Sequence, residues 1–235
     1  VQAGDGGMEY PTIIFNAGYS PGLMAHEGGH QWFYGLLGNN ESREAWLDEG
    51  IITYTTDKNT TERFNYPVKI EPESGLAGIF QLPYDQHNNY RSYWGISKLG
   101  IEEPSLTHSD FFKDDLAYSF GTYVKGSFIP PMLEYVVGDK VFAGFMKKYF
   151  QLWHFKHPQT SDFQRLAEKE SGMELDWFFD EWLRTTKTCD YAVNSFNGKW
   201  IDINGIRKYR VSASLENRDD IIMPIDLQFN FLDGR

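Results

Sequence analysis

Two histidines four residues apart, with a glutamate beside the first, form the clearest chemical pattern in the sequence. His26, Glu27 and His30 lie in the run AHEGGHQWF. Residues four apart share one face of a helix, so both imidazoles can point at one metal ion. Neutral imidazoles at this spacing suit zinc. Glu27 can reach a water on the ion, which is the position of a general base.

A catalytic zinc needs a third protein ligand and one open position. Glu49, in the later run WLDEG, has the right chemistry. Residues 38–40 (GNN) predict a turn, and a second helical run is expected from about Ser42. A helix, a short loop and a return helix would bring Glu49 back to the histidines. The predicted site is His26, His30, Glu49 and a water.

The alternative interpretation is an ordinary amphipathic helix that happens to carry two histidines. Gly28 and Gly29 favour this alternative, because each glycine costs a helix interior about 1 kcal/mol relative to alanine. Packing and metal must therefore hold the helix. The apolar surface for that packing comes from Trp32, Phe33, Leu36 and Leu37.

Composition excludes several classes of protein. The formal net charge of −11 argues against binding to nucleic acid or to an anionic membrane surface. Cys189 is the only cysteine, so no intrachain disulfide can form. No apolar run approaches the ~18 residues of a membrane span, so we expect a soluble chain of unassigned compartment. The chain begins at Val1 rather than at methionine, which suggests a fragment.

The first segment predicts an extended edge. Residues 8–15 are expected to form one strand, and the glycines before it allow another backbone to approach closely. An extended peptide can pair along such an edge. Glu9 would lie there, although a solvated strand carboxylate is the favoured interpretation from the residues alone.

The middle of the chain predicts helices. Pro130 and Pro131 interrupt one apolar pattern and should kink or restart that helix. Ser161 and Gln164 predict a capping box for the helix expected over residues 159–172. Asp176 is expected to cap the helix that follows. The expected helices cover residues 88–100, 124–137, 139–150, 159–172 and 177–185. Two tyrosines precede the second of these helices, Tyr118 and Tyr123, and by pattern alone both belong to the core.

From residue 191 onward, the pattern of apolar and polar residues changes. Alternating apolar and polar residues predict strands, with Asn-Gly turns at 197–198 and 204–205. We expect the start of a β-sandwich, with a domain boundary near Thr188.

Several runs in order resemble the gluzincin zinc aminopeptidases, a family that includes aminopeptidase N and leukotriene hydrolase. GGMEY is similar to the family's exopeptidase motif, and HEGGHQWFYG with WLDEG to its zinc signature. AYSFGTYVKG is similar to the segment with the catalytic tyrosine, and DFQRLAEKESGMELDWFFDEWL to the end of the catalytic domain. The resemblance implies an α+β fold: a mainly α-helical thermolysin-like domain over residues 1–187 with a β edge at its N-terminal end. Residues 188–235 would begin a C-terminal β-sandwich. An N-terminal domain and the opening of the catalytic domain are expected in the parent protein.

The resemblance also implies roles for individual residues and a substrate class, peptides with a free N-terminus. His26, His30 and Glu49 would hold one zinc ion. Glu27 would activate the water, Tyr123 would donate to the oxyanion, and Tyr118 would lie close by. Glu9 would bind the α-ammonium of the substrate, with Gly6 and Gly7 lining the peptide.

The sequence departs from the family pattern at a few positions, and these keep alternatives open. Tyr10 stands where asparagine is usual, and glycines fill the middle of the zinc motif. One alternative is an endopeptidase or epoxide hydrolase of the same fold. The other is a non-catalytic peptide-binding protein whose site has decayed, a hypothesis that the motif glycines and Pro130–Pro131 support.

Overall fold

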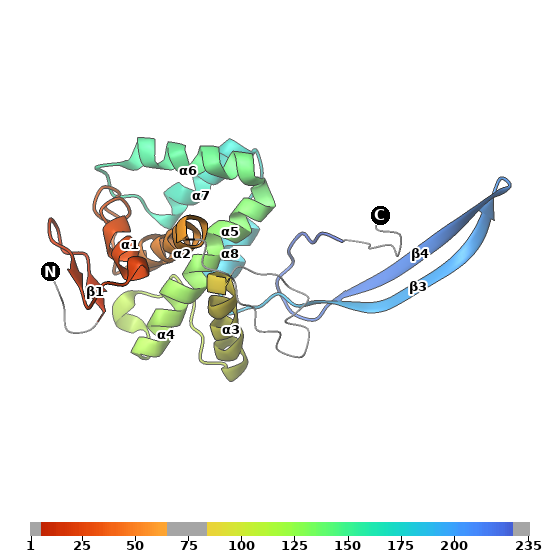
Figure 1. The fold of residues 1–235 in the computed structure, drawn as a ribbon, viewed down its shortest axis with the longest axis horizontal. Coiled ribbons are helices and arrows are strands. Elements are labelled where there is room, and N and C mark those ends of the chain that lie inside the picture. Colours follow the sequence, from red (N-terminus) through yellow and green to blue (C-terminus); the bar gives the residue numbers. More distant parts are fainter. Residues whose placement is uncertain (1–5, 65–83, 228–235) are drawn as a thin grey trace. The chain divides into compact units, whose positions relative to one another are not determined.

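The structure, a computed structural model, describes residues 6–64 and 84–227. The chain divides into two compact units, Val1–Thr186 and Lys187–Arg235. Helices dominate the first unit, and a hairpin forms most of the second (Figure 1). Helices combined with small antiparallel sheets confirm the predicted α+β class. None of the helices within the described ranges is long and apolar enough to cross a membrane.

The N-terminal edge is a short hairpin rather than one strand. β1 (Gly7–Met8) pairs antiparallel with β2 (Phe15–Asn16), so the prediction of a single strand was wrong. Pro11 and Thr12 explain the difference. Proline cannot continue a ladder, and Thr12 has a positive φ of 68°, as the third residue of a type II turn with proline at its second position requires.

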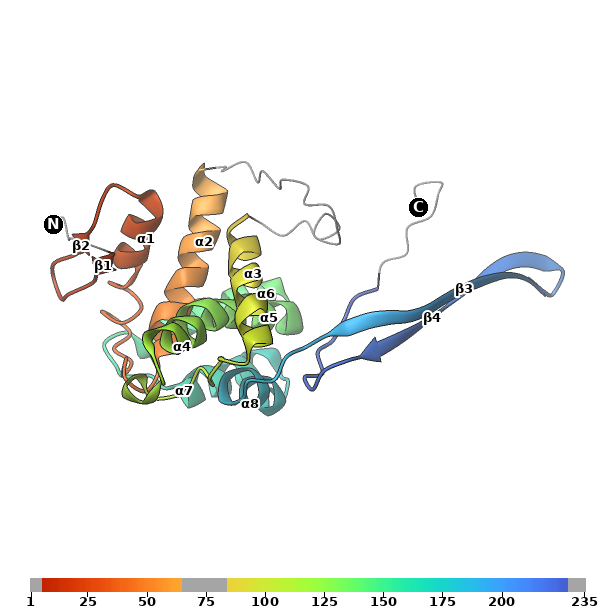
Figure 2. The same ribbon diagram turned by 90° about the horizontal axis from the view of Figure 1, so that it is seen from below.

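Helix α1 (Pro21–Gly29) carries the first histidine and packs beside this hairpin and against α2 (Ile51–Phe64), as Figure 2 shows. It begins with a favourable cap, because the Ser20 hydroxyl accepts from a backbone N–H and a proline occupies the first turn. His30 follows the last helical residue with a helical φ of −61°. Its side chain therefore stays one turn beyond His26.

A buried π-helical turn, η1 (Trp46–Gly50), leads into α2. The return helix therefore begins near residue 45 rather than at Ser42. Trp46 anchors the turn in the core, since its indole N–H donates to Thr160 Oγ1 at 2.8 Å. The side chain of Trp46 also packs edge-to-face against Phe163.

The core lies between the later helices. Phe145, Tyr149 and Phe163 are almost fully buried and pack edge-to-face or tilted, with 4.8 Å between the ring centroids of Phe145 and Phe163. The elements of this region are α3 (Tyr84–Leu99), η3 (Ser109–Phe111), α4 (Asp115–Ser119), η4 (Phe120–Val124), α5 (Lys125–Val137), α6 (Asp139–Trp153), α7 (Thr160–Ser171) and α8 (Asp176–Arg184).

Two predicted helix features were wrong. Pro130 and Pro131 lie inside one helix, α5, which does not restart at them. The helical backbone of α4 and η4 leads directly into α5, and Pro130 itself is buried, so the packing outweighs the missing backbone donors. The capping box of α7 uses Gln159 and Asp162 instead of the predicted pair, because the N-cap residue is Gln159, two residues before Ser161.

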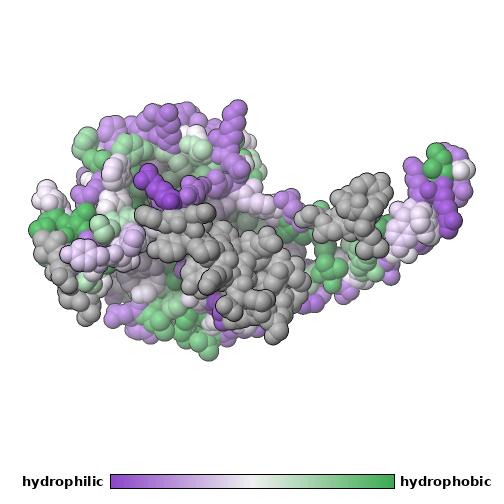
Figure 3. Space-filling model, in the orientation of Figure 1, coloured by the Kyte–Doolittle hydropathy of each residue, from purple (hydrophilic) through white to green (hydrophobic). Residues whose placement is uncertain are grey.

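The second unit contains, in its described part, a long antiparallel hairpin of β3 (Tyr191–Ile203) and β4 (Ile206–Asn217). The predicted turn at residues 204–205 is present with both φ angles positive. The predicted turn at 197–198 was wrong, because Gly198 pairs with Val211 inside the ladder. Figure 3 shows a mostly hydrophilic surface at the tip of the hairpin, with one small apolar area.

Candidate metal centre

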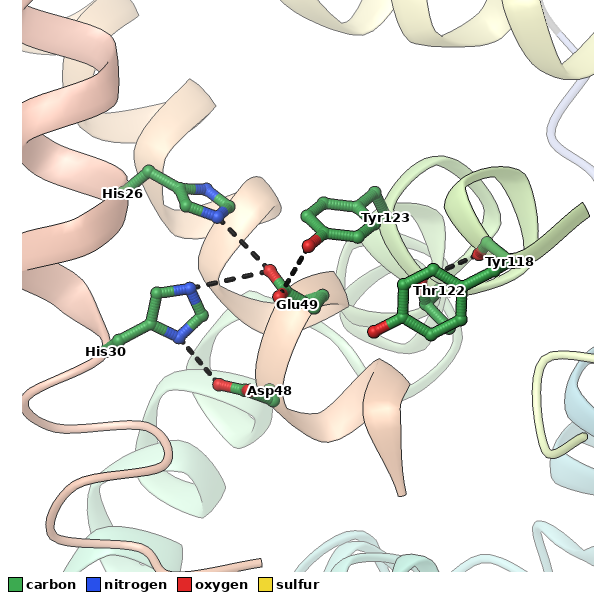
Figure 4. A network of polar contacts seen from close by, with 7 residues as sticks. All are labelled: His26, His30, Asp48, Glu49, Tyr118, Thr122 and Tyr123. Atoms are coloured by element: carbon green, nitrogen blue, oxygen red, sulfur yellow. Dashed lines mark hydrogen bonds and ion pairs between the residues drawn. The ribbon is translucent and has the colours of Figure 1, made fainter. Parts of the chain in front are cut away.

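The three predicted ligands converge on one point (Figure 4). Glu49 Oε2 lies 3.2 Å from His26 Nε2 and 3.4 Å from His30 Nε2. Two ligands each about 2.0–2.2 Å from a tetrahedral zinc ion would be separated by about 3.3–3.5 Å. The donor atoms of His26, His30 and Glu49 also lie within 4.8 Å of one another. The spacing and the chemistry of these donors therefore fit a zinc ion.

A second carboxylate orients His30 from behind. Asp48 Oδ1 lies 2.6 Å from His30 Nδ1, and both side chains are almost fully buried. Burial opposes the charge on His30, but hydrogen bonds with Asp48 and Glu49 raise its pKa to about 10. Burial raises the pKa of Asp48 to about 7, against the effect of His30. A carboxylate on the outer nitrogen fixes the tautomer of a metal-binding histidine.

Sequence reasoning missed Asp48. The available signal was a carboxylate directly before Glu49, in the same run WLDEG. On a regular helix, adjacent residues point in directions about 100° apart, so spacing did not indicate that both would face the histidines. In the π-helical turn η1 both residues do face the histidines. Glu49 lies beside the Nε2 atoms of both imidazoles, and Asp48 lies beside Nδ1 of His30.

The other oxygen of Glu49 holds the tyrosine that the family resemblance singled out. The Tyr123 hydroxyl donates to Glu49 Oε1 at 2.6 Å, and the Tyr123 ring stacks on His26 with an interplanar angle of 13°. Burial raises the pKa of Glu49, but hydrogen bonds from His26, His30 and Tyr123 outweigh it and bring the pKa to about 2. Burial and the Glu49 charge raise the pKa of Tyr123, which keeps the phenol a donor.

Glu27 is buried beside the centre and has a free oxygen. Its Oε2 has no hydrogen-bond partner among the residues that the structure describes. Burial raises the pKa of Glu27, partly offset by the two histidines. The side chain lies against Gly7, where an added Cβ would lie 2.1 Å from Glu27 Oε1. A side chain at position 7 would therefore displace the Glu27 carboxylate, and an unpaired carboxylate oxygen remains available next to the donor set.

Glu9 also reaches the centre. It is buried, and its carboxylate oxygen, a nitrogen of His30 and an oxygen of Asp48 lie within 4.8 Å of one another. The carboxylates gathered here outnumber the two imidazoles, so the site attracts a cation. Gly6, two residues after the start of the GDGG run, adopts a φ of 65°, a conformation that favours glycine.

Tyr118 packs against Tyr123, which in turn stacks on the predicted ligand His26. Its centroid lies 6.1 Å from that of Tyr123, with the rings nearly perpendicular. Burial and the charges of Glu49 and Asp48 raise the pKa of Tyr118 to about 12. Apart from Gly6, the residues selected from the sequence thus lie at or next to one centre.

Two π-helical turns carry the key side chains, Glu49 on η1 and Tyr123 on η4. Such turns are rare and recur at functional sites. The turn η1 and the start of α5, which directly follows η4, approach through glycine: a Cβ on Gly50 would lie 2.7 Å from the carbonyl carbon of Gly126, and one on Gly126 would lie 3.0 Å from Gly50 Cα. This backbone contact lies one residue after Glu49 and three residues after Tyr123, so a change in it is expected to alter the distance between their side chains.

Two histidines, a glutamate and an unpaired carboxylate on a helical α+β domain form a donor set of the kind that zinc hydrolases use. The domain of peptidase family M1 matches residues 19–182, and the chain belongs to that family.

Individual relatives agree with the family. The chain is 28% identical to human aminopeptidase B over 202 residues, covering 77% of this chain and 29% of that protein. It is 27% identical to leukotriene A-4 hydrolase of Xenopus laevis over 168 residues, covering 68% of this chain and 26% of that protein. The chain thus spans less than a third of the length of these curated relatives.

Solved structures share the fold. An M1 zinc metallopeptidase from Deinococcus radiodurans superposes with a TM-score of 0.57 at 19% identity, covering 77% of this chain and 37% of that one. Leukotriene A4 hydrolase of Saccharomyces cerevisiae gives a TM-score of 0.52 at 24% identity, covering 76% and 29%.

Proposed function

We propose that this chain carries the catalytic site of a zinc aminopeptidase, which hydrolyses the first peptide bond of peptides with a free N-terminus. Membership of peptidase family M1 supports the class of reaction. The observation that carries the proposal is the position of Glu49 Oε2, 3.2 and 3.4 Å from the two imidazole nitrogens. Those separations suit a tetrahedral zinc ion.

His26, His30 and Glu49 would hold one zinc ion. When bound, zinc polarises the substrate carbonyl and lowers the pKa of a water. Asp48 would keep His30 in the tautomer whose Nε2 is free to bind the metal, because its carboxylate accepts a hydrogen bond from the N–H at Nδ1.

Glu27 would act as general base and then as general acid. Its free oxygen can take a proton from the attacking water and pass it to the leaving amine. The raised pKa brings Glu27 closer to the range in which a carboxyl both accepts and returns a proton near neutral pH. Tyr123 would donate to the oxyanion, a contact typically worth ~3–4 kcal/mol in the transition state.

Glu9 would bind the α-ammonium of the substrate and so fix the register of cleavage, with Gly6 and Gly7 beside the peptide. The burial of Glu9 near His30 and Asp48 supports this role, because a buried carboxylate calls for a cationic partner. We further propose that residues 1–187 are catalytic and that 188–235 begin a β-sandwich domain.

The test combines metal analysis with two substrates. The wild type should contain about one zinc per chain and hydrolyse a free aminoacyl anilide but not its N-acetylated form. Glu27→Gln should keep the zinc and lose most of the activity, whereas Glu49→Gln should lose zinc. Equal rates on both substrates would instead indicate an endopeptidase, and zinc without any hydrolysis in the wild type would favour a binding protein.

A further inference from the structure

A buried ion pair lies directly behind the turn that carries Tyr123. Lys125 Nζ donates to Glu102 Oε1 at 2.5 Å and to the carbonyl oxygen of Thr185 at 2.8 Å. The side chains of Lys125 and Glu102 are 1% and 5% exposed. None of the roles proposed above uses this pair.

The pair is not explained by stability alone. Replacing a buried ion pair with apolar groups of similar size is often neutral or stabilising. Here the second oxygen of Glu102 is buried without a hydrogen-bond partner within the described ranges, so the desolvation of that carboxylate is only partly compensated. A buried pair kept under these conditions needs another explanation, and its position supplies one.

Tyr123, in η4, and Lys125, the first residue of the continuous helix α5, point in opposite directions. Residues two apart point about 200° apart on a helix with 3.6 residues per turn. Accordingly, Tyr123 reaches Glu49 on one side, while Lys125 reaches Glu102 and the C-terminal end of α8 on the other. The π-helical turn η4 is thus tied from both sides.

We propose that Lys125, through Glu102 and the Thr185 carbonyl, is a positioning residue that holds the Tyr123 hydroxyl at the metal centre. The inference rests on the proposed function for its catalytic consequence, but the placement of Tyr123 can be measured without catalysis. Lys125 does not touch the reacting atoms; it acts through the orientation of η4.

The variant that tests the proposal removes both charges. Lys125→Met alone leaves Glu102 buried without a cation and endangers folding, whereas Lys125→Met with Glu102→Leu replaces the pair with apolar groups. The control is Lys148→Met with Glu170→Leu, because Lys148 and Glu170 form a pair of similar length, 2.7 Å, that is partly exposed. The control pair connects α6 to α7 and does not contact η4.

The kinetic arm is a double-mutant cycle with Tyr123→Phe. The apolar pair should lower kcat by about 10-fold or more, part of the roughly 10²–10³-fold that one oxyanion donor supplies, with KM and zinc content nearly unchanged. In the Tyr123→Phe background the same change should alter kcat by less than about threefold, because both substitutions remove one interaction. An equal loss in both backgrounds would overturn the proposal.

The second arm places 3-fluorotyrosine at position 123 and records its ¹⁹F resonance. The apolar pair should shift or broaden the signal, and the control pair should leave it unchanged. A resonance that is neither shifted nor broadened in the apolar-pair variant overturns the positioning role. If the wild type lacks zinc-dependent peptidase activity, the proposed function fails, and the fluorine spectra still decide the role of Lys125.

Discussion

Gly50→Ala tests whether the glycine contact sets the geometry of the centre. The added Cβ would lie 2.7 Å from the carbonyl carbon of Gly126 and 2.8 Å from its Cα, where ordinary contacts begin at 3.4 Å. Both neighbours are backbone atoms, so no side chain can rotate away. The turn η1 and the start of α5 must separate by 3.4 − 2.7 = 0.7 Å.

That displacement is enough to lose a hydrogen bond. The Tyr123–Glu49 distance of 2.6 Å would become 2.6 + 0.7 = 3.3 Å if the turns move apart along it, beyond the usual range for two oxygens. Overpacking should lower the free energy of unfolding by about 1–3 kcal/mol. A misplacement near 1 Å can lower kcat by up to about 10²-fold.

Urea unfolding and steady-state kinetics measure both effects. Gly144→Ala is the matched control: Gly144 is also in a helix, α6, and its added Cβ meets nothing within 4 Å. That change should stabilise the protein by about 0.5–1 kcal/mol and leave kcat unchanged. Wild-type stability and kcat in Gly50→Ala would refute the idea that backbone contact sets the spacing of Glu49 and Tyr123.

Three further predictions concern the metal ligand His30 and the residues Asp48 and Gly7, which lie close to the centre. Asp48→Asn should weaken zinc binding by about 10–100-fold in a chelator competition, because the buried carboxylate behind His30 is lost; unchanged affinity would exclude that role. Gly7→Ala should lower kcat while zinc content stays constant, since its Cβ would displace Glu27; full activity would show that Glu27 can move without consequence. Zinc binding should release a proton from His30, whose pKa of about 10 keeps it protonated at neutral pH without metal. Apparent affinity should therefore rise about tenfold per pH unit up to pH ~10, and calorimetry in two buffers should detect the proton.

Local patterns in the sequence predicted the helix of the zinc motif and the helices α3 and α5 to α8, but not α4, and they were sufficient to bring the site residues together. The histidines share a face because one helical turn separates them, and an irregular connection over residues 31–44, with turns at 34–36 and 41–43, returns the chain to Glu49. Contacts between distant segments could not be predicted this way. Gly50 and Gly126 meet through the packing of α5 on η1, and no spacing within the sequence encodes that contact.

Errors arose where tertiary context overrode a local signal. Asn197–Gly198 has ideal turn residues but lies within a ladder, where the ring of Tyr209 covers Gly198: an added Cβ would lie 2.3 Å from the Tyr209 hydroxyl. Glycine there makes room for a cross-strand aromatic ring rather than a turn. The same residue type thus had a packing role that composition alone could not distinguish from a turn.

The same distinction applies to the glycines of the zinc motif, which were an argument for a decayed site. An added Cβ on Gly29 would lie 2.9 Å from Ile52 Cδ1, so glycine allows α1 to pack closely on α2, whereas Gly28 faces open space. One of the two glycines therefore has a structural reason that is independent of catalysis. The prolines lose their force as well, because Pro130 and Pro131 lie within an unbroken α5. What remains of the decayed-site hypothesis is Gly28. Gly28→Ala should add helix propensity worth up to about 1 kcal/mol without a clash. If the site is functional, zinc affinity should be equal or slightly higher in that variant, and a loss of zinc would mean that the open space beside α1 is itself needed.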